Sequence, residues 1–256
     1  MVMNINAISF NLRYRDDPNQ NSIDERAPRL HSILAKYDAD ILCFQEISKA
    51  WQPHLEADYG NDYDMYLQYR NETVDIEAVS TLWKKDKFIC LNKGCFWLSD
   101  TPEVESRGWD EVYNCYRICT YVILQEKETG KTFTVFNTHY GFGDKGQTDS
   151  CKLVYEYSKK ISAYPTLVLG DFNMNPESPA YATMIQYFRD VNSCTANDWR
   201  ATWHGYEPHV ITSAHIDYCF IDEKITPLKQ FLITDTVDGK FPSDHYGLYC
   251  SLSFGD

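Results

Sequence analysis

The sequence predicts an α/β fold in which two sheets pack face to face, with helices on their outer surfaces. Many short segments have the pattern of strands, few segments between them have helical periodicity, and most connections are short. A doubly wound parallel sheet fits less well because too few helices separate the strands. The 256 residues, 43% of them hydrophobic, show no break in composition, so we expect one domain spanning residues 1–256.

The chain begins with a predicted strand, a helix and a second strand. Residues 3–12 alternate in character, so Ile5 and Ile8 fall on opposite faces. Residues 24–38 place apolar side chains at the spacing of one helix face, and acidic residues stand where they favour a helix start. Residues 39–46 read as a buried strand that ends near a glutamate.

The rest of the chain is predicted to be mostly strands. We expect them at 63–69, 79–84, 87–92, 117–125, 132–139, 165–170, 215–221 and 246–253. A glycine-rich loop is expected at 141–147, and helices at about 150–161 and 178–188, with Pro179 in the first turn of the second.

The charge of the chain narrows the choice of partners. The formal net charge is −13 and basic residues form no run, so a long nucleic-acid duplex is a poor substrate candidate, although a local basic patch stays compatible with this. Part of the acidity fits a metal site. We see no signal peptide and no apolar run long enough to cross a membrane. The nine cysteines form no Cys-X-X-Cys pair, and we interpret them as buried free thiols. We therefore expect a cytoplasmic protein. The sequence implies no stable protein partner.

Polar residues that could take part in catalysis or metal binding gather at the ends of predicted strands. Glu46 ends an apolar run, so its carboxylate must be paired, solvated or bound to metal. Asn11 closes the first strand, where an asparagine is often only a turn former. His139 ends the strand at 132–139 and is suited to donate to a phosphoryl oxygen, although a structural role is equally compatible.

Two further groups lie later in the chain. Asp171 and Asn173 follow a buried strand at positions i and i+2, so extended geometry would aim both the same way. Asp217 is placed to fix the tautomer of His245, while Asp244 is free to contact a metal. Carboxylate and carbonyl oxygens suit Mg²⁺ or Mn²⁺ rather than zinc. Together these groups supply what phosphoryl hydrolysis needs: a metal, an oriented water and oxyanion donors.

The order of these motifs resembles the endonuclease/exonuclease/phosphatase superfamily. The motifs run from Asn11 to His245 and are Ser9-Phe10-Asn11, Gln45-Glu46, Asn137-Thr138-His139, Gly170-Asp171-Phe172-Asn173, Ile216-Asp217-Tyr218 and Ser243-Asp244-His245. The resemblance implies a four-layer α/β/β/α sandwich with two packed, mostly antiparallel sheets. It also implies a metal-dependent phosphohydrolase with Mg²⁺ or Mn²⁺ as cofactor.

The resemblance implies a role for each motif residue. Glu46 would bind the metal, with Asn11 and Asp244 beside it. Asp171 would orient or deprotonate the attacking water. The remaining positions would contact or position phosphate: Asn11, Asn173, His139, and His245 oriented by Asp217.

A longer stretch is similar to a bacterial, deadenylase-like subgroup. It comprises residues 96–102, 108–110 and 202–206, and it makes Arg117 a candidate phosphate ligand, with a structural salt bridge as the alternative. Residues 140–143 depart from that subgroup, which affects the substrate pocket. Glu77 matches a family glutamate too thinly to receive a role.

The sequence therefore predicts a divalent-metal-dependent phosphodiesterase or phosphatase. Its expected substrate is a small phosphorylated molecule or a short single-stranded nucleic acid. A nuclease acting on duplex DNA and a non-catalytic binding module with the same fold are the alternatives. A non-catalytic binding module would be expected to lack a key acid or histidine, and this sequence lacks none of them.

Overall fold

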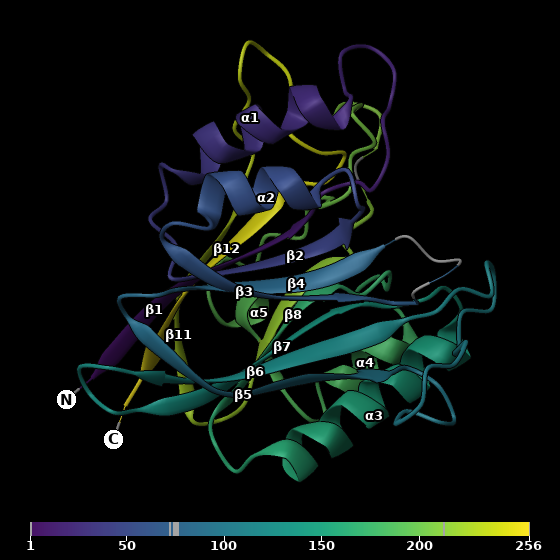
Figure 1. Ribbon diagram of the computed structural model, residues 1–256. Helices are drawn as coiled ribbons and strands as arrows, with labels where there is room; N and C mark the ends of the chain where they lie inside the picture. Colours follow the sequence, from purple (N-terminus) through teal and green to yellow (C-terminus); the bar gives the residue numbers. More distant parts are fainter. Residues whose placement is uncertain (1, 72, 74–76, 212, 256) are drawn as a thin grey trace.

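Two sheets lie face to face, and helices cover the outer face of each (Figure 1). The computed structural model describes residues 2–71, 73, 77–211 and 213–255. From top to bottom in Figure 1 the layers are α1 and α2, the first sheet, the second sheet, then α3 and α4. This confirms the predicted four-layer α/β/β/α sandwich.

The first sheet has the strand order β11-β12-β1-β2-β4-β3 within the described residues. Its strands are β1 (Met3–Asn11), β2 (Ile41–Ile47), β3 (Tyr63–Tyr69), β4 (Ala78–Lys84), β11 (Ile225–Ile233) and β12 (Gly247–Phe254). Strands β1 and β2 run parallel, and the other neighbours pair antiparallel.

The second sheet repeats this design, with the order β5-β6-β7-β8-β10-β9 over the part of the chain that is described. Its strands are β5 (Phe88–Trp97), β6 (Ile118–Glu126), β7 (Thr132–His139), β8 (Thr166–Asp171), β9 (Arg189–Asp190) and β10 (Asp217–Ile221). Here β7 and β8 form the parallel pair. The predicted strands are therefore present, and the two sheets are mostly antiparallel.

The helices depart from prediction at several ends. They are α1 (Ile23–Leu34), α2 (Gln52–Tyr59), α3 (Asp144–Ile161), α4 (Pro179–Met184) and α5 (Val191–Cys194). Helix α1 begins at a capping box and ends before residue 38, and α4 ends before residue 188. Helix α3 begins inside the predicted loop 141–147. No helix among the described residues has the length and apolar character needed to span a membrane.

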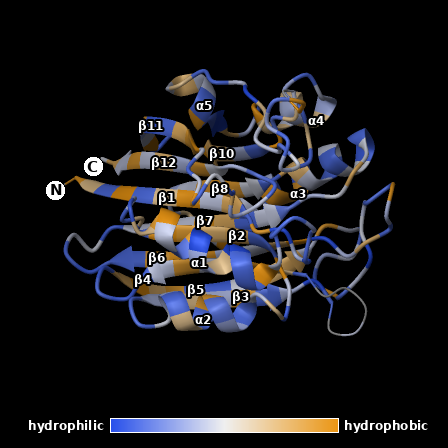
Figure 2. Ribbon diagram, turned by 90° about the horizontal axis from the view of Figure 1, so that it is seen from above, coloured by the Kyte–Doolittle hydropathy of each residue, from blue (hydrophilic) through white to orange (hydrophobic). Residues whose placement is uncertain are grey.

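Three apolar layers hold the sandwich together. The central one lies between the sheets and contains Ile5 and Ala7, whereas Ile8 belongs to the layer under α1 and α2, which confirms the alternation predicted for the first strand. The third layer packs α3 and α4 on the second sheet. In Figure 2 apolar segments run along the strands of both sheets, while most loops are hydrophilic.

The parallel pairs determine where polar groups can gather. Met3 pairs with Phe254, so both termini lie at one end of the sandwich, and Asn11 lies at the other end of β1 (Figure 1). Across the interface the buried Gln45 Nε2 donates to Asn137 Oδ1 over 2.7 Å. This bond ties β2 to β7 close to the ends of all four parallel strands.

Candidate active site

A cavity of about 890 Å³ opens at this end of the sandwich. The predicted site residues that line it are Glu46, Arg117, His139, Asp171, Asn173, Asp244 and His245. The two others reach it through a neighbour, because Asn11 bonds to Asp171 and Asp217 bonds to His245. The structure thus brings all nine together, although their individual roles stay predictions.

Asn11 links two carboxylates that line the cavity. Its Nδ2 donates to Glu46 Oε1 over 3.1 Å and to Asp171 Oδ2 over 2.9 Å. Its Oδ1 accepts a hydrogen bond from the backbone of Arg13. In this orientation the amide turns its donor toward the carboxylates and positions Glu46 and Asp171, while a role of Asn11 at the metal stays a prediction.

Glu46 is aimed into the cavity by a local irregularity of β2. The pairing of β2 with β4 shifts register between Phe44 and Ile47, and Glu46 has φ of 57°. A bulge of this kind re-aims a side chain at a sheet end. The second carboxylate oxygen, Oε2, accepts the backbone N–H of Tyr14 over 3.0 Å.

The loop after β1 is held by a buried arginine that the sequence did not single out. Arg26 Nη2 donates to the carbonyls of Arg13 and Arg15 over 2.9 and 2.7 Å. Trp51 Nε1 donates to the Arg13 carbonyl as well. These bonds fix a segment whose own side chains, from Arg13 to Arg15, line the cavity.

His245 and Asp217 form a buried ion pair beside the cavity. His245 Nδ1 lies 2.9 Å from Asp217 Oδ2. Burial alone would lower the pKa of His245, but Asp217, with help from Asp171 and Asp244, raises it to about 10. His245 is therefore a cation at neutral pH, and its Nε2 lies 3.8 Å from Asp171 Oδ2.

Asp171 is a buried carboxylate with the character of a base. Burial, reinforced by the nearby charge of Asp217, raises its pKa above the usual aspartate value despite the bond from Asn11 and the charge of His245. Its Oδ2 faces both imidazoles, at 3.5 Å from His139 Nε2 and 3.8 Å from His245 Nε2. A raised pKa makes a carboxylate better able to take a proton from water.

Asn173 does not follow the extended geometry that was expected after Asp171. It has φ of 49°, and its backbone N–H donates to Asp171 Oδ1 over 3.0 Å. Its Nδ2 donates to the carbonyl of Tyr140. The aspartate side chain thus closes a turn, and both side chains line the cavity.

The tautomer of His139 follows from its neighbour Arg70. Arg70 Nη2 lies 2.7 Å from His139 Nδ1, and both side chains are buried. Arginine only donates, so Nδ1 accepts and the proton sits on Nε2, which faces Asp171. Burial, together with the charges of Arg117 and Arg70, lowers the pKa of His139 well below its usual value, so this imidazole is a neutral donor.

Replacing Arg70 with methionine should change the tautomer of His139. Without the guanidinium donor, Nδ1 of His139 is expected to take the proton, and kcat/KM on a phosphate ester should fall about tenfold. Nitrogen NMR of the histidine side chains, assigned with His139→Asn, reports the tautomer directly. Arg70→Lys retains a charged donor and should restore part of the wild-type signal, and an unchanged tautomer in Arg70→Met would contradict the assignment.

The cavity contains a donor set that fits a hard divalent cation. One ligand atom from each of Glu46, Glu77 and His139 lies within 4.8 Å of the other two. The oxygen donors of this set are the two glutamates, and Nδ1 of His139 is already bonded to Arg70. Glu77 also pairs with Arg70 over 2.8 Å. Carboxylate oxygens suit Mg²⁺ or Mn²⁺.

Asp244 lies on the same cavity, with its oxygens already engaged. Its Oδ2 accepts Trp203 Nε1 over 3.2 Å and lies 3.8 Å from Arg13 Nε. Ser243 contacts the other oxygen. A ligand role for Asp244 stays a prediction.

Arg117 forms a salt bridge, which was the alternative predicted for it, and it also lines the cavity. Its Nε and Nη2 both lie 3.0 Å from Asp110 Oδ2. Its Nη1 is buried and has no hydrogen-bond partner among the described residues. The structural and the ligand-binding readings of Arg117 are therefore compatible.

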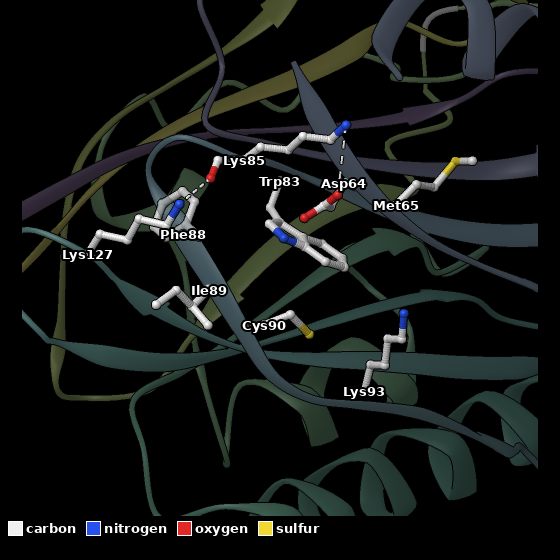
Figure 3. A pocket seen from close by; sticks show the side chains of 9 residues that line it. All are labelled: Asp64, Met65, Trp83, Lys85, Phe88, Ile89, Cys90, Lys93 and Lys127. Carbon is white, nitrogen blue, oxygen red and sulfur yellow. Dashed lines mark hydrogen bonds and ion pairs between the residues drawn. The ribbon is translucent and has the colours of Figure 1, made fainter. Parts of the chain in front are cut away.

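A second cavity, of about 440 Å³, lies at the edges of the two sheets and has a different character. Figure 3 shows the lysines around it (Lys85, Lys93 and Lys127) together with Trp83 and Phe88. Of the described residues that line it, Asp64 supplies the carboxylate and none is a histidine. It lacks the clustered acids and imidazoles of the larger cavity.

Solved structures resemble the whole chain. An endonuclease/exonuclease/phosphatase family protein from Bacteroides thetaiotaomicron is 26% identical, with full coverage of both chains and a TM-score of 0.91. A mannosyl-6-phosphatase from the same species is also 26% identical, covers 97% of this chain and 99% of its own, and has a TM-score of 0.86.

Curated relatives match over part of their length. The Ccr4 subunit, a 3'-5'-exoribonuclease of the CCR4-Not complex in Aspergillus niger, is 24% identical over 198 residues, which are 59% of this chain and 30% of the relative. Two uncharacterized proteins of Acanthamoeba polyphaga mimivirus are 26% and 27% identical, over 30% and 59% of their lengths. The chain therefore spans less than two thirds of these relatives.

A family model covers nearly the whole sequence. It describes the endonuclease/exonuclease/phosphatase family and matches residues 8–245, an interval that contains all nine predicted site residues. Members of this family hydrolyse phosphate esters and generally use divalent metals. The match, the fold and the shared cavity agree, and the chain belongs to the endonuclease/exonuclease/phosphatase family.

Proposed function

We propose that this protein is a Mg²⁺- or Mn²⁺-dependent hydrolase of phosphate esters that acts on a small phosphorylated molecule. The observation that carries the proposal is the convergence of Glu46, His139, Asp171 and His245 on one cavity. Since the site draws on residues from both ends of the chain, it also supports one domain over residues 1–256.

The chain supplies distinct groups for binding and for proton transfer. Glu46 and Glu77, with Asp244 nearby, would hold the cation, and Asn11 would keep Glu46 in place. A bound Mg²⁺ or Mn²⁺ would supply charge neutralisation on the phosphate oxygens.

Asp171 is the base in this proposal. It would orient the attacking water and take its proton, since burial raises its pKa. His139 would donate from Nε2 to a phosphate oxygen, and the cationic His245 would stabilise the negative charge that develops there. Asp217 holds His245 by its other nitrogen, and Asn173 would help to position the phosphate.

The size and charge of the site favour a small substrate. A cavity of about 890 Å³ suits a single small molecule. The net charge of −13 opposes a long duplex, whose phosphates need many cationic contacts. The mannosyl-6-phosphatase that resembles the whole chain gives independent support to a phosphorylated small molecule, with a short single strand as the next candidate.

A substrate panel tests the proposal. We expect turnover of small monoesters or diesters in Mg²⁺ or Mn²⁺, its loss in excess chelator, and its loss in His245→Ala with folding retained. The panel should contain sugar phosphates, nucleotides, short oligonucleotides and duplex DNA. Selective cleavage of the duplex, with salt-sensitive binding, would favour the nuclease alternative. Failure to bind any divalent metal would favour a non-catalytic module.

A further inference from the structure

An aromatic pair, the exposed Tyr113 and the half-buried Phe142, lines the active-site cavity. Tyr113 is 65% exposed, and its ring meets Phe142 edge to face, with the centroids 5.3 Å apart and the planes at 76°. Both side chains line the cavity. An apolar ring surface kept in contact with water beside a polar site is suited to stack on a ligand.

The loop that carries Tyr113 is held in place by one buried carboxylate. Asp110 Oδ1 accepts the backbone N–H groups of Val112 and Tyr113 over 3.1 and 2.8 Å. Its Oδ2 accepts both Nε and Nη2 of Arg117 at 3.0 Å. The Asp110 side chain thus fixes the position of Arg117 relative to the loop that carries Tyr113.

The loop is also attached to the segment that carries Phe142. The backbone N–H of Glu111 donates to the carbonyl of Phe142 over 2.9 Å, and Glu111 Oε1 accepts the N–H of Gly146 in α3 over 3.0 Å. Gly141 lies so close that an added Cβ would approach the Asp110 Cα to 2.8 Å. The aromatic pair is therefore pre-organised, which reduces the entropy lost when a ligand binds.

Arg117 connects the aromatic pair with the reacting groups. Its Cζ lies 5.9 Å from the centroid of Phe142, and its charge contributes to lowering the pKa of His139. The Arg117 side chain is 5% exposed, and its Nη1 has no hydrogen-bond partner among the described residues. Arg117 also lines the cavity, so its positive charge favours an anionic ligand beside the aromatic pair.

We propose that Tyr113 and Phe142 form a subsite for a ring in the leaving group of the substrate. The inference rests on the proposed function and narrows its substrate class to small phosphate esters whose leaving group carries a sugar or nucleobase ring. Both ring types stack on aromatic faces, so the test has to distinguish them.

Binding to the metal-free protein tests the subsite without turnover. Calorimetry would compare methyl phosphate, glucose 6-phosphate and adenosine monophosphate as probes. We expect at least one ring-bearing probe to bind about tenfold more tightly than methyl phosphate, and Tyr113→Ala to remove that advantage. Tyr113→Phe should keep it, because the ring remains. Tyr164→Ala, at an exposed tyrosine outside the cavity, is the matched control and should also keep it.

The pattern of affinities decides the proposal. A preference for the sugar phosphate assigns the subsite to a sugar ring, and a preference for the nucleotide assigns it to a base. Equal binding of all probes, no binding, or an advantage that survives in both Tyr113→Ala and Phe142→Leu would overturn it. Absence of hydrolysis in the metal-supplemented panel would instead count against the proposed function, since the affinity comparison requires no turnover.

Discussion

Replacing Glu46 with glutamine should lower kcat/KM for phosphate esters by about 10³-fold or more. Glu46 accepts from Asn11 Nδ2 at one oxygen and from the Tyr14 backbone at the other. Glutamine keeps the shape but offers one acceptor, and its amide group would face a donor. The change also removes a negative charge from the group that would hold the cation. Initial rates at saturating Mg²⁺ or Mn²⁺ would measure the loss, and calorimetry the weaker metal binding.

The matched control for this variant is Glu223→Gln. Glu223 is an exposed carboxylate between β10 and β11 and does not line the cavity. It should leave both rate and metal affinity at their starting values. If Glu46→Gln turned over substrate as fast as Glu223→Gln, Glu46 would have no part in the chemistry.

Replacing Gly170 with alanine should destabilise the fold by about 3–5 kcal/mol. Gly170 has φ of 153°, and an added Cβ would approach the Thr138 carbonyl oxygen on the neighbouring strand β7 to 2.1 Å. Strands β7 and β8 pair in parallel here and lie under the active site, so the clash can be relieved only by separating them. Urea unfolding followed by circular dichroism would measure the change.

Gly239→Ala is the control that separates the steric clash from the cost of placing alanine at a positive φ. Gly239 has φ of 72°, and a Cβ there would meet nothing within 4 Å. Its variant should lose only about 1 kcal/mol, the cost of a positive φ for alanine. Equal losses at the two positions would show that the contact with Thr138 is not the limiting factor.

The main features of the fold could be predicted because the apolar pattern repeats what the layers require. Ile5 and Ile8 alternate between two cores, as a strand buried on both faces must. Helix α2 could not be predicted, since Gln52–Tyr59 buries only Leu55 and Tyr59 and has no apolar stripe. Strand β11, an edge strand with a bulge near Pro227, mixes exposed and buried residues in a pattern too irregular to identify.

The site was predictable where a motif marks a strand end and unpredictable where the function depends on a neighbour in space. Glu46 and Asp171 follow apolar runs, so their positions were visible in the sequence. Arg70 and Glu77 lie outside those motifs, and only the three-dimensional structure shows them beside His139. Asp110 formed part of a recognisable stretch, but its role in holding Tyr113 depends on backbone contacts that composition does not encode.

The hydrogen bond between Gln45 and Asn137 makes the two halves of the molecule interdependent. Glu46 belongs to one sheet, whereas His139 and Asp171 belong to the other, so neither half contains a working set of groups. A slip of one residue between the sheets is about 3.3 Å, which is as long as the contacts among these side chains. Catalytic activity therefore requires that the two sheets pack in the correct alignment. The hydrogen bond between Gln45 and Asn137 helps to fix that alignment.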